Sequence, residues 1–287
     1  MSNKKRACDL AQTTPNKCVR DAFPPDDHLS HLMRIERELM PRHDYLETTQ
    51  KNITDQHRSI TVRYQTQCAY ALRMSSGATF MSIAYMDRFL STYSMERRHL
   101  SILCAASLFV ASKFEDTIDT QFNVDELLDV CELQGKNARG TLLNMEAKLL
   151  RTLDYRLSQP TSKAFIVLFL ANSGIYDNRT YYCALFLAQI FQTDCACMKY
   201  VPSLIGKLAA CISINTCNEV DSCHNRYLSS EVEKLGSSDI AKFCIRDLQR
   251  SVECEKNDHG NDSPIILRYA SDAYLNVADI GNIHFDI

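Results

Sequence analysis

Apolar side chains recur along most of this chain at the three- and four-residue spacing of helices, and sustained two-residue alternation is almost absent. The first such pattern begins at residue 27, where Leu29, Leu32 and Ile35 form one apolar stripe that Pro41 ends. The next five patterns cover residues 55–74, 79–93, 97–114, 124–133 and 139–153. The chain is therefore predicted to be all-helical.

A second group of helical patterns follows the stretch Leu157–Ser162, where Pro160 precedes two hydroxyl residues suited to an N-cap. Its five patterns cover residues 162–173, 178–193, 201–215, 227–235 and 237–250. In each group the middle pattern is strongly apolar, so the other helices of that group are expected to enclose it. We predict two tandem five-helix domains preceded by an N-terminal helix.

The predicted boundaries follow changes in composition along the chain. Residues 1–26 are polar and proline-containing, which is typical of a flexible leader. The N-terminal helix and the first domain occupy residues 27–160, and the second domain occupies residues 161–250. Residues 251–287 are predicted to form a polar tail in which Glu255–Ser263 is mobile.

The run Ser101–Val110 contains no charged residue, yet it leads directly into Lys113 and the acids Glu115 and Asp116. A lysine at the end of a buried helix can extend its ammonium into water, or donate to the last carbonyls of the helix. It can also face the backbone carbonyls of a partner, because an ammonium has three donors and no acceptor. The pattern alone leaves these three readings open.

Three motifs resemble a known family. The stretches "DRFLS" (Asp87–Ser91), "LFVASKFED" (Leu108–Asp116) and "MEAKLLRTLDYRL" (Met145–Leu157) occur in the order and at the separations of the cyclin box of cyclins. The preceding stretch His31–Glu47 resembles the corresponding segment of D-type cyclins, most closely those of plants. The resemblance implies two cyclin-fold domains.

The resemblance also implies a function, namely a regulatory subunit that binds and activates a cyclin-dependent Ser/Thr protein kinase and controls cell-cycle progression at G1/S. It implies that Lys113 donates to carbonyls, and Glu146 accepts from N–H groups, of the mobile C-helix of the kinase. The residues expected to form an apolar collar around this pair are Val110, Phe114, Leu150, Tyr155 and Leu157. Packing inside the domain remains the alternative for Val110 and Leu150.

Counting back from Asp87 places Arg58 at the position of the arginine in the family's "MRAIL" motif, and the resemblance implies a buried ion pair between Arg58 and Asp87. This pair is expected to be structural, because removing one partner strands the other charge. The resemblance further implies a groove that docks peptides of substrates and kinase inhibitors, at the positions Ile60, Tyr64, Gln67 and Leu100. The chain has no tryptophan, and Gln67 offers no negative charge, so we expect this docking to be absent or altered.

The composition of the chain argues against two classes of partner, nucleic acids and membranes. With 32 basic and 35 acidic residues the net charge is 32 − 35 = −3, which is unlike the concentrated basic surface of a nucleic-acid-binding protein. No apolar run reaches the ~20 residues of a membrane-spanning helix, and no secretory signal opens the chain. We therefore expect no membrane and no nucleic-acid partner, and a location in the nucleus and the cytoplasm.

The 13 cysteines lack the paired CxxC spacing of a zinc site, both at Cys195–Cys197 and in the group Cys217, Cys223 and His224. No phosphate-binding glycine loop or nucleophile motif occurs either. We expect no metal, no cofactor and no enzymatic activity. The alternative to a kinase activator is a cyclin-fold interaction module that acts in transcription or scaffolding without activating a kinase.

Overall fold

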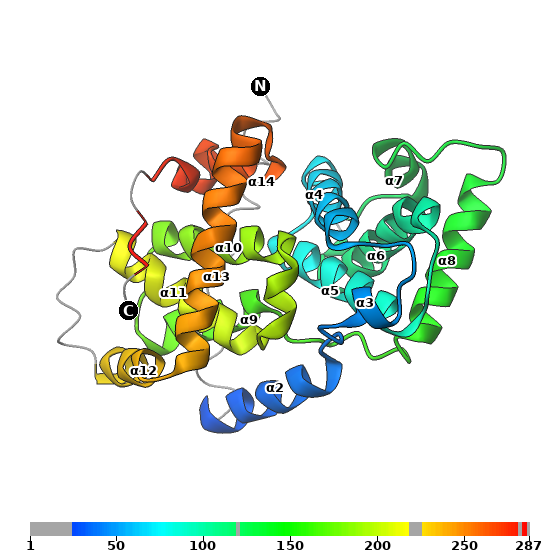
Figure 1. Cartoon of the computed structure of the whole chain (residues 1–287). Coiled ribbons are helices and arrows are strands. Elements are labelled where there is room, and N and C mark those ends of the chain that lie inside the picture. The colour runs from blue at the N-terminus through cyan, green and yellow to red at the C-terminus, as the bar shows by residue number, and fades with distance from the viewer. Residues whose placement is uncertain (1–24, 119–120, 218–225, 281–282, 286–287) are drawn as a thin grey trace. The chain divides into compact units, whose positions relative to one another are not determined.

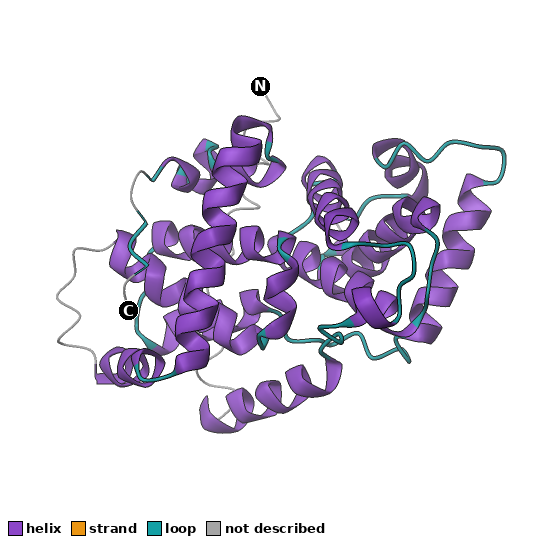
Figure 2. Cartoon of the chain, viewed as in Figure 1, coloured by secondary structure: helices purple, strands orange, loops and turns teal. Residues whose placement is uncertain are grey.

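The structure is a computed structural model of the chain that describes residues 25–118, 121–217, 226–280 and 283–285. Within these ranges every regular element is helical, so the predicted all-helical class is confirmed (Figure 2). No helix in the described ranges combines the length and the apolar character needed to cross a membrane. The predicted leader lies almost entirely outside the described residues.

The described chain forms two compact units. The first unit consists of Glu38–Thr161 together with the short segment Gln192–Lys199, which the sequence did not assign to it. Its α-helices are α3 (Tyr45–Thr48), α4 (Asp55–Ala71), α5 (Ser76–Thr92), α6 (Leu100–Glu115), α7 (Val124–Val130) and α8 (Ala138–Thr152). Five of them, α4 to α8, correspond to the five patterns predicted over residues 55–153.

Helix α6 forms the centre of the first unit, as its charge-free sequence requires. Helices α4, α5, α7 and α8 all pack against it, and Figure 1 shows them around it. Its side chains from Ile102 to Ser112 are buried almost without interruption. The last turn leaves this enclosure, so that Lys113 and Phe114 are exposed.

Polar side chains fix where the helices of the first unit begin. Thr54 accepts from the backbone N–H of His57, while the His57 ring bonds the backbone of Thr54, so the two residues form a capping box on α4. The side chains of Ser75 and Asn123 each accept from a backbone N–H in the first turn of α5 and α7, and so cap these helices. These caps orient α4 and α5, the two helices that carry Arg58 and Asp87.

The second unit consists of the described residues up to Arg37, Ser162–Phe191 and the described residues from Tyr200 onward. Helix α11 (Pro202–Cys217) packs against α9 (Ser162–Asn172), where a Cβ on Gly206 would lie 2.7 Å from the carbonyl oxygen of Ser162. Only glycine permits this close approach of the two helices. Besides α2 (Pro25–Leu39), most of which belongs to this unit, its α-helices are α9 (Ser162–Asn172), α10 (Asn178–Thr193), α11 (Pro202–Cys217), α12 (Arg226–Gly236), α13 (Asp239–Cys254) and α14 (Pro264–Tyr269).

The predicted N-terminal helix is α2 (Pro25–Leu39). Its Glu36 is buried, and its carboxylate accepts from the backbone N–H of Ser203 at 2.8 Å and from the Ser203 hydroxyl at 2.6 Å. Ser203 lies in the first turn of α11, where N–H groups lack helical partners. Glu36 therefore joins α2 to the start of α11.

The structure corrects the prediction of a polar tail, because much of residues 251–287 is packed. Helix α13 continues to Cys254, and Glu255, expected to begin a mobile stretch, is buried and accepts from the Ser263 hydroxyl at 2.6 Å. Further on, Tyr269 is fully buried against Phe186. The missed contacts come from short helical segments, such as α14, which are too brief to show a helical period in the sequence.

Candidate functional site

The exposed end of α6 brings together the two charged residues that the sequence singled out. Lys113 lies in the last turn of α6 and Glu146 lies in the middle of α8, and the Lys113 ammonium bonds a carboxylate oxygen of Glu146. The two side chains are 43% and 13% exposed. They therefore lie on the same side of the first unit, at its surface.

The aromatic ring of Phe109 completes the setting of Lys113. The Nζ atom lies 3.9 Å from the ring centroid, within the range of a cation–π interaction. Phe109 is itself nearly buried one helical turn before Lys113 and packs against Phe122. The Lys113 ammonium thus contacts both the Glu146 carboxylate and the Phe109 ring. Both contacts lie at the surface of the unit, as expected for a lysine that extends toward water or faces a partner.

The five apolar residues predicted around the pair divide by exposure. Phe114 is 46% exposed and Tyr155 is 65% exposed, while Leu150 and Leu157 are partly covered. Val110 is only 3% exposed, which corrects its assignment to a partner-facing set. Val110 lies inside the helix bundle, so core packing accounts for it.

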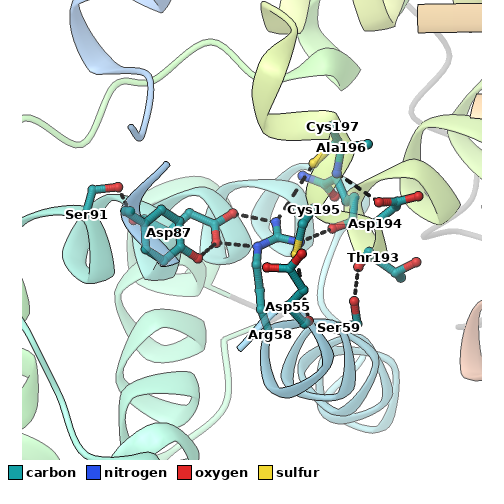
Figure 3. A network of polar contacts seen from close by, with 12 residues as sticks. Asp55, Arg58, Ser59, Asp87, Ser91, Thr193, Asp194, Cys195, Ala196 and Cys197 are labelled. Atoms are coloured by element: carbon teal, nitrogen blue, oxygen red, sulfur yellow. Dashed lines mark hydrogen bonds and ion pairs between the residues drawn. The ribbon is translucent and has the colours of Figure 1, made fainter. Parts of the chain in front are cut away.

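The second predicted ion pair lies in the interior of the first unit. Arg58 on α4 donates through Nε and Nη2 to the two carboxylate oxygens of Asp87 on α5, at 2.8 and 2.7 Å (Figure 3). The side chains are 1% and 6% exposed. The Tyr45 hydroxyl also donates to Asp87 at 2.8 Å, a contact that no motif in the sequence indicated.

Arg58 reaches beyond Asp87 to the segment Gln192–Lys199. Its Nη1 atom donates to the carbonyl oxygen of Gln192 at 3.0 Å. Its Nη2 atom lies 3.9 Å from the sulfur of Cys197 (Figure 3). Beside it, the Ser59 hydroxyl donates to the carbonyl oxygen of Thr193 at 2.7 Å. One buried guanidinium thus joins α4, α5 and this segment.

The electrostatics of this network favour one protonation state. Burial alone would lower the pKa of Arg58, but the surrounding groups, led by the Asp87 carboxylate, together hold the pKa well above its ordinary value. Burial, and the charge of Asp87, raise the pKa of Tyr45 well above its ordinary value. Burial likewise raises the pKa of the Cys197 thiol to about 12. The network therefore contains the Arg58 cation, the Asp87 anion, and the neutral side chains of Tyr45 and Cys197.

The four positions predicted for a peptide-docking groove differ in exposure. Ile60 is 54% exposed and Gln67 is exposed, but Leu100 is buried. The Tyr64 hydroxyl donates to the carbonyl oxygen of Cys131 at 2.7 Å, which ties its ring to the end of α7. The positions do not form a uniformly exposed apolar surface.

Within the described ranges no group of three or more histidine, cysteine or acidic side chains is arranged to hold a metal ion. Cys195 and Cys197 lie beside Arg58, and burial raises the pKa of the Cys195 thiol to about 11. Two members of the other cysteine group, Cys223 and His224, lie outside the described residues.

Comparison with known families matches both halves of the chain. Residues 27–158 match the model of the cyclin N-terminal domain, and residues 160–282 match that of the cyclin C-terminal domain. The tandem arrangement predicted from the sequence is confirmed. The second match extends well beyond residue 250, in agreement with the packed residues after α13.

Similar proteins come from plants. A G2/mitotic-specific cyclin C13-1 of Daucus carota is 28% identical over 61% of this chain and 51% of its own length. Cyclin-A1-4 of Oryza sativa subsp. japonica is 29% identical over 67% of this chain and 53% of its own, and Cyclin-A3-1 of the same species is 26% identical over 82% and 63%. The chain thus spans about half of the length of the first two. These relatives are A-type and mitotic cyclins, so the D-type assignment is wrong.

A solved structure has the same fold. The X-ray structure of a viral cyclin from herpesvirus saimiri matches with a TM-score of 0.67, over 78% of this chain and 96% of that one. The two sequences are 19% identical, so this likeness concerns the fold alone.

Proposed function

The chain belongs to the cyclin family, and we propose that it acts as a regulatory subunit that binds and activates a cyclin-dependent Ser/Thr protein kinase. The observation that carries the proposal is the Lys113–Glu146 pair, which lies at the surface between α6 and α8. The exposed aromatic side chains Phe114 and Tyr155 belong to the same predicted set. Aromatic side chains are enriched at protein interfaces, where they often act as anchors.

The pair is suited to bind a partner's main chain. Lys113 has three N–H donors and Glu146 has two acceptor oxygens, and one contact between them leaves the others available. Lys113 is 43% exposed, so water screens the pair although Glu146 is mostly covered. An ion pair at the surface contributes roughly 0–1 kcal/mol, so exchanging it for contacts with a partner costs little. In the proposed complex Lys113 donates to carbonyls, and Glu146 accepts from N–H groups, of the C-helix of the kinase.

Activation then follows as a shift in the populations of two kinase conformations. The proposed surface binds the conformation in which the kinase C-helix is turned inward and its lysine–glutamate ion pair is formed. A ligand that prefers one conformation raises its population by the ratio of its two affinities. The phosphoryl-transfer chemistry belongs to the kinase, and this chain supplies no catalytic group.

The test is an affinity purification of the full chain from plant cells, followed by mass spectrometry and a kinase assay. A Ser/Thr kinase should copurify, and its activity should depend on this chain. The matched control is the exchange variant Lys113→Glu/Glu146→Lys, which retains an opposite-charge pair but reverses its direction. If wild type and control copurify the kinase equally, Lys113 and Glu146 do not contribute to the interface with the kinase.

The same experiment separates the alternative function. Recovery of transcription or scaffolding proteins without any kinase would identify an interaction module that does not activate kinases. Kinase inhibitors and substrates are further proposed partners, expected in smaller amounts with the same bait. Recovery of nucleic acid would contradict the expectation drawn from the net charge of −3.

Control of cell-cycle progression is proposed on the basis of the relatives, one of which is named a mitotic cyclin. G1/S timing and a location in the nucleus and the cytoplasm remain proposals from the sequence. Kinase activity bound to this chain, followed through a synchronised culture, tests the timing. Imaging of the fluorescently tagged chain in the same culture tests the location.

A further inference from the structure

The turn that follows α8 has an unusual backbone. Asp154 and Tyr155 have φ values of 52° and 53°, so two consecutive residues other than glycine adopt the left-handed conformation. This conformation is unfavourable for L-residues and persists where the surroundings hold it in place. Within the turn, the N–H of Tyr155 donates to the carbonyl oxygen of Leu150 at 3.0 Å.

Arg88 on α5 holds this turn from outside. Its Nη1 atom donates to the carbonyl oxygen of Arg156 at 2.8 Å, and its Nη2 atom lies 3.3 Å from the carbonyl oxygen of Leu153. Nη1 also lies 3.4 Å from the side-chain oxygen of Gln159. The guanidinium therefore bridges both sides of the two left-handed residues.

The chemistry of this contact requires arginine. The carbonyls at the end of α8 carry the negative end of the helix dipole, which a cation stabilises. A guanidinium presents several N–H donors in one rigid plane and can serve two separated carbonyls at once, whereas an ammonium acts as a point charge. Lysine at position 88 would retain the charge but lose the bridge.

Two further contacts fix the same turn. One helical turn before Arg88, the Tyr85 hydroxyl donates to the carbonyl oxygen of Leu157 at 2.8 Å. On the other side, Arg156 pairs with Glu38 at 2.6 Å. Held in this way, the turn leaves Tyr155 as one of the most exposed large apolar side chains among the described residues.

We propose that Arg88 is a positioning residue for kinase binding, which holds the left-handed turn so that Tyr155 is presented to the partner. The inference rests on the function proposed above, and Arg88 itself need not touch the kinase. A positioned anchor loses less conformational freedom on binding, so Arg88 is expected to strengthen binding without changing the activated state.

The first test needs no kinase. Amide hydrogen exchange is measured on the full chain carrying Arg88→Lys, with Arg139→Lys as a matched surface control. Exchange at Tyr155 and Arg156 should accelerate about tenfold or more, as expected from the loss of hydrogen bonds to a charged group, while α6 stays unchanged. Unchanged protection at Tyr155 would overturn the proposal whatever the kinase result.

The second test separates positioning from general stability. Arg88→Lys should raise the concentration of this chain needed for half-maximal kinase activation by about tenfold and leave the maximal activity unchanged, as expected when only pre-organisation is lost. Arg88→Lys added to Tyr155→Ala should cost little more than Tyr155→Ala alone. Full additivity of the two changes would show that Arg88 does not act through Tyr155 and would overturn the proposal.

A third variant keeps the proposal testable if Arg88→Lys does not fold. Tyr85→Phe removes only the hydroxyl that reaches Leu157, and it should change exchange and activation in the same direction by a smaller factor. No effect of Tyr85→Phe on exchange in the turn would count against the proposal. If the wild-type chain activates no kinase, the proposed function fails, and the exchange results still decide whether Arg88 holds the turn.

Discussion

The first unit contains two opposite-charge pairs whose surroundings differ in almost every respect. Arg58 and Asp87 are sealed in the interior, joined by two short hydrogen bonds and surrounded by further polar contacts. Lys113 and Glu146 meet at the surface, where water and a partner can reach them. The same kind of contact therefore serves to hold the fold in one place and to remain exchangeable in the other.

Burial decides the difference. A buried charge that loses its partner has no water to replace it, so the pair acts as a single unit. An exposed pair is weakened by water and salt, and its members can change partners at little cost. Variants that remove one charge from each pair should therefore have opposite consequences for stability and for activity.

The largest expected effect is on stability. Arg58→Ala leaves Asp87 buried without its cation and should lower the free energy of unfolding by about 3–5 kcal/mol. Chemical denaturation monitored by circular dichroism measures the change. Arg139→Ala serves as the control, because Arg139 and Asp125 form a pair that is 63% and 77% exposed, and its effect should stay below about 1 kcal/mol. An equal loss of unfolding free energy in both variants would contradict the proposed difference between the buried and the exposed pair.

The next effect is on kinase activation. Lys113→Glu should lower the apparent affinity for the kinase by at least about tenfold, since hydrogen bonds to a charged group are lost. Its melting temperature should stay near that of wild type. A kinase titration and a thermal melt of the same preparation measure both. Loss of folding in Lys113→Glu would instead make Lys113 a structural residue.

A smaller effect separates the pairs by their response to salt. Double-mutant cycles should give a coupling energy below about 1 kcal/mol for Lys113 and Glu146, decreasing toward zero in 1 M salt. The coupling of Arg58 with Asp87 should be larger and nearly independent of salt, because buried charges are screened much less. Similar salt dependence of both couplings would mean that water reaches Arg58.

The smallest effect concerns Glu36, a third carboxylate, which is buried like Asp87 but takes its hydrogen bonds from the neutral donors of Ser203. Burial raises the pKa of Glu36 above its ordinary value of 4.5. The stability that this group contributes is fully present below pH 4.5 and is lost as the pH rises through the raised pKa of the folded state.

The variant Glu36→Gln removes this titration. The stability of wild type minus that of the variant should therefore be largest below pH 4.5 and should decline as the pH rises. Denaturant melts of both proteins across this range measure the difference. A difference that grows with pH would mean that the folded protein favours the ionised carboxylate.

The sequence predicted the helices of both units because the core-facing side chains repeat with the helical period. It also pointed to Lys113, since a charge at the end of an apolar run stands out, whereas Arg58 was indicated only by the family resemblance, from its distance to Asp87. It did not indicate Tyr45 or the carbonyl of Gln192, because their contacts join residues that are distant in the chain. A backbone acceptor moreover has no signature in the residue type.

Two other misses have a different physical origin. The family resemblance implied that Lys113 and Glu146 contact the same segment of a partner. Nothing in the sequence indicated that they bond to each other, because that depends on side-chain rotamers at the surface. The packed residues after α13 were missed because a helix as short as α14 buries single aromatic side chains, such as Tyr269, without a recognisable period. The role of Arg88 became apparent only once the left-handed turn was located.

The hydrogen bonds of Arg58 and Ser59 to Gln192 and Thr193 each span 134 positions of the chain. During synthesis, the first unit therefore cannot complete its interior until the ribosome has added Lys199, long after Thr161. Contacts between such distant positions slow folding, because a long loop must close before they form. A nascent chain stalled between these two points would hold Arg58 without its carbonyl acceptor and would be an early substrate for chaperones.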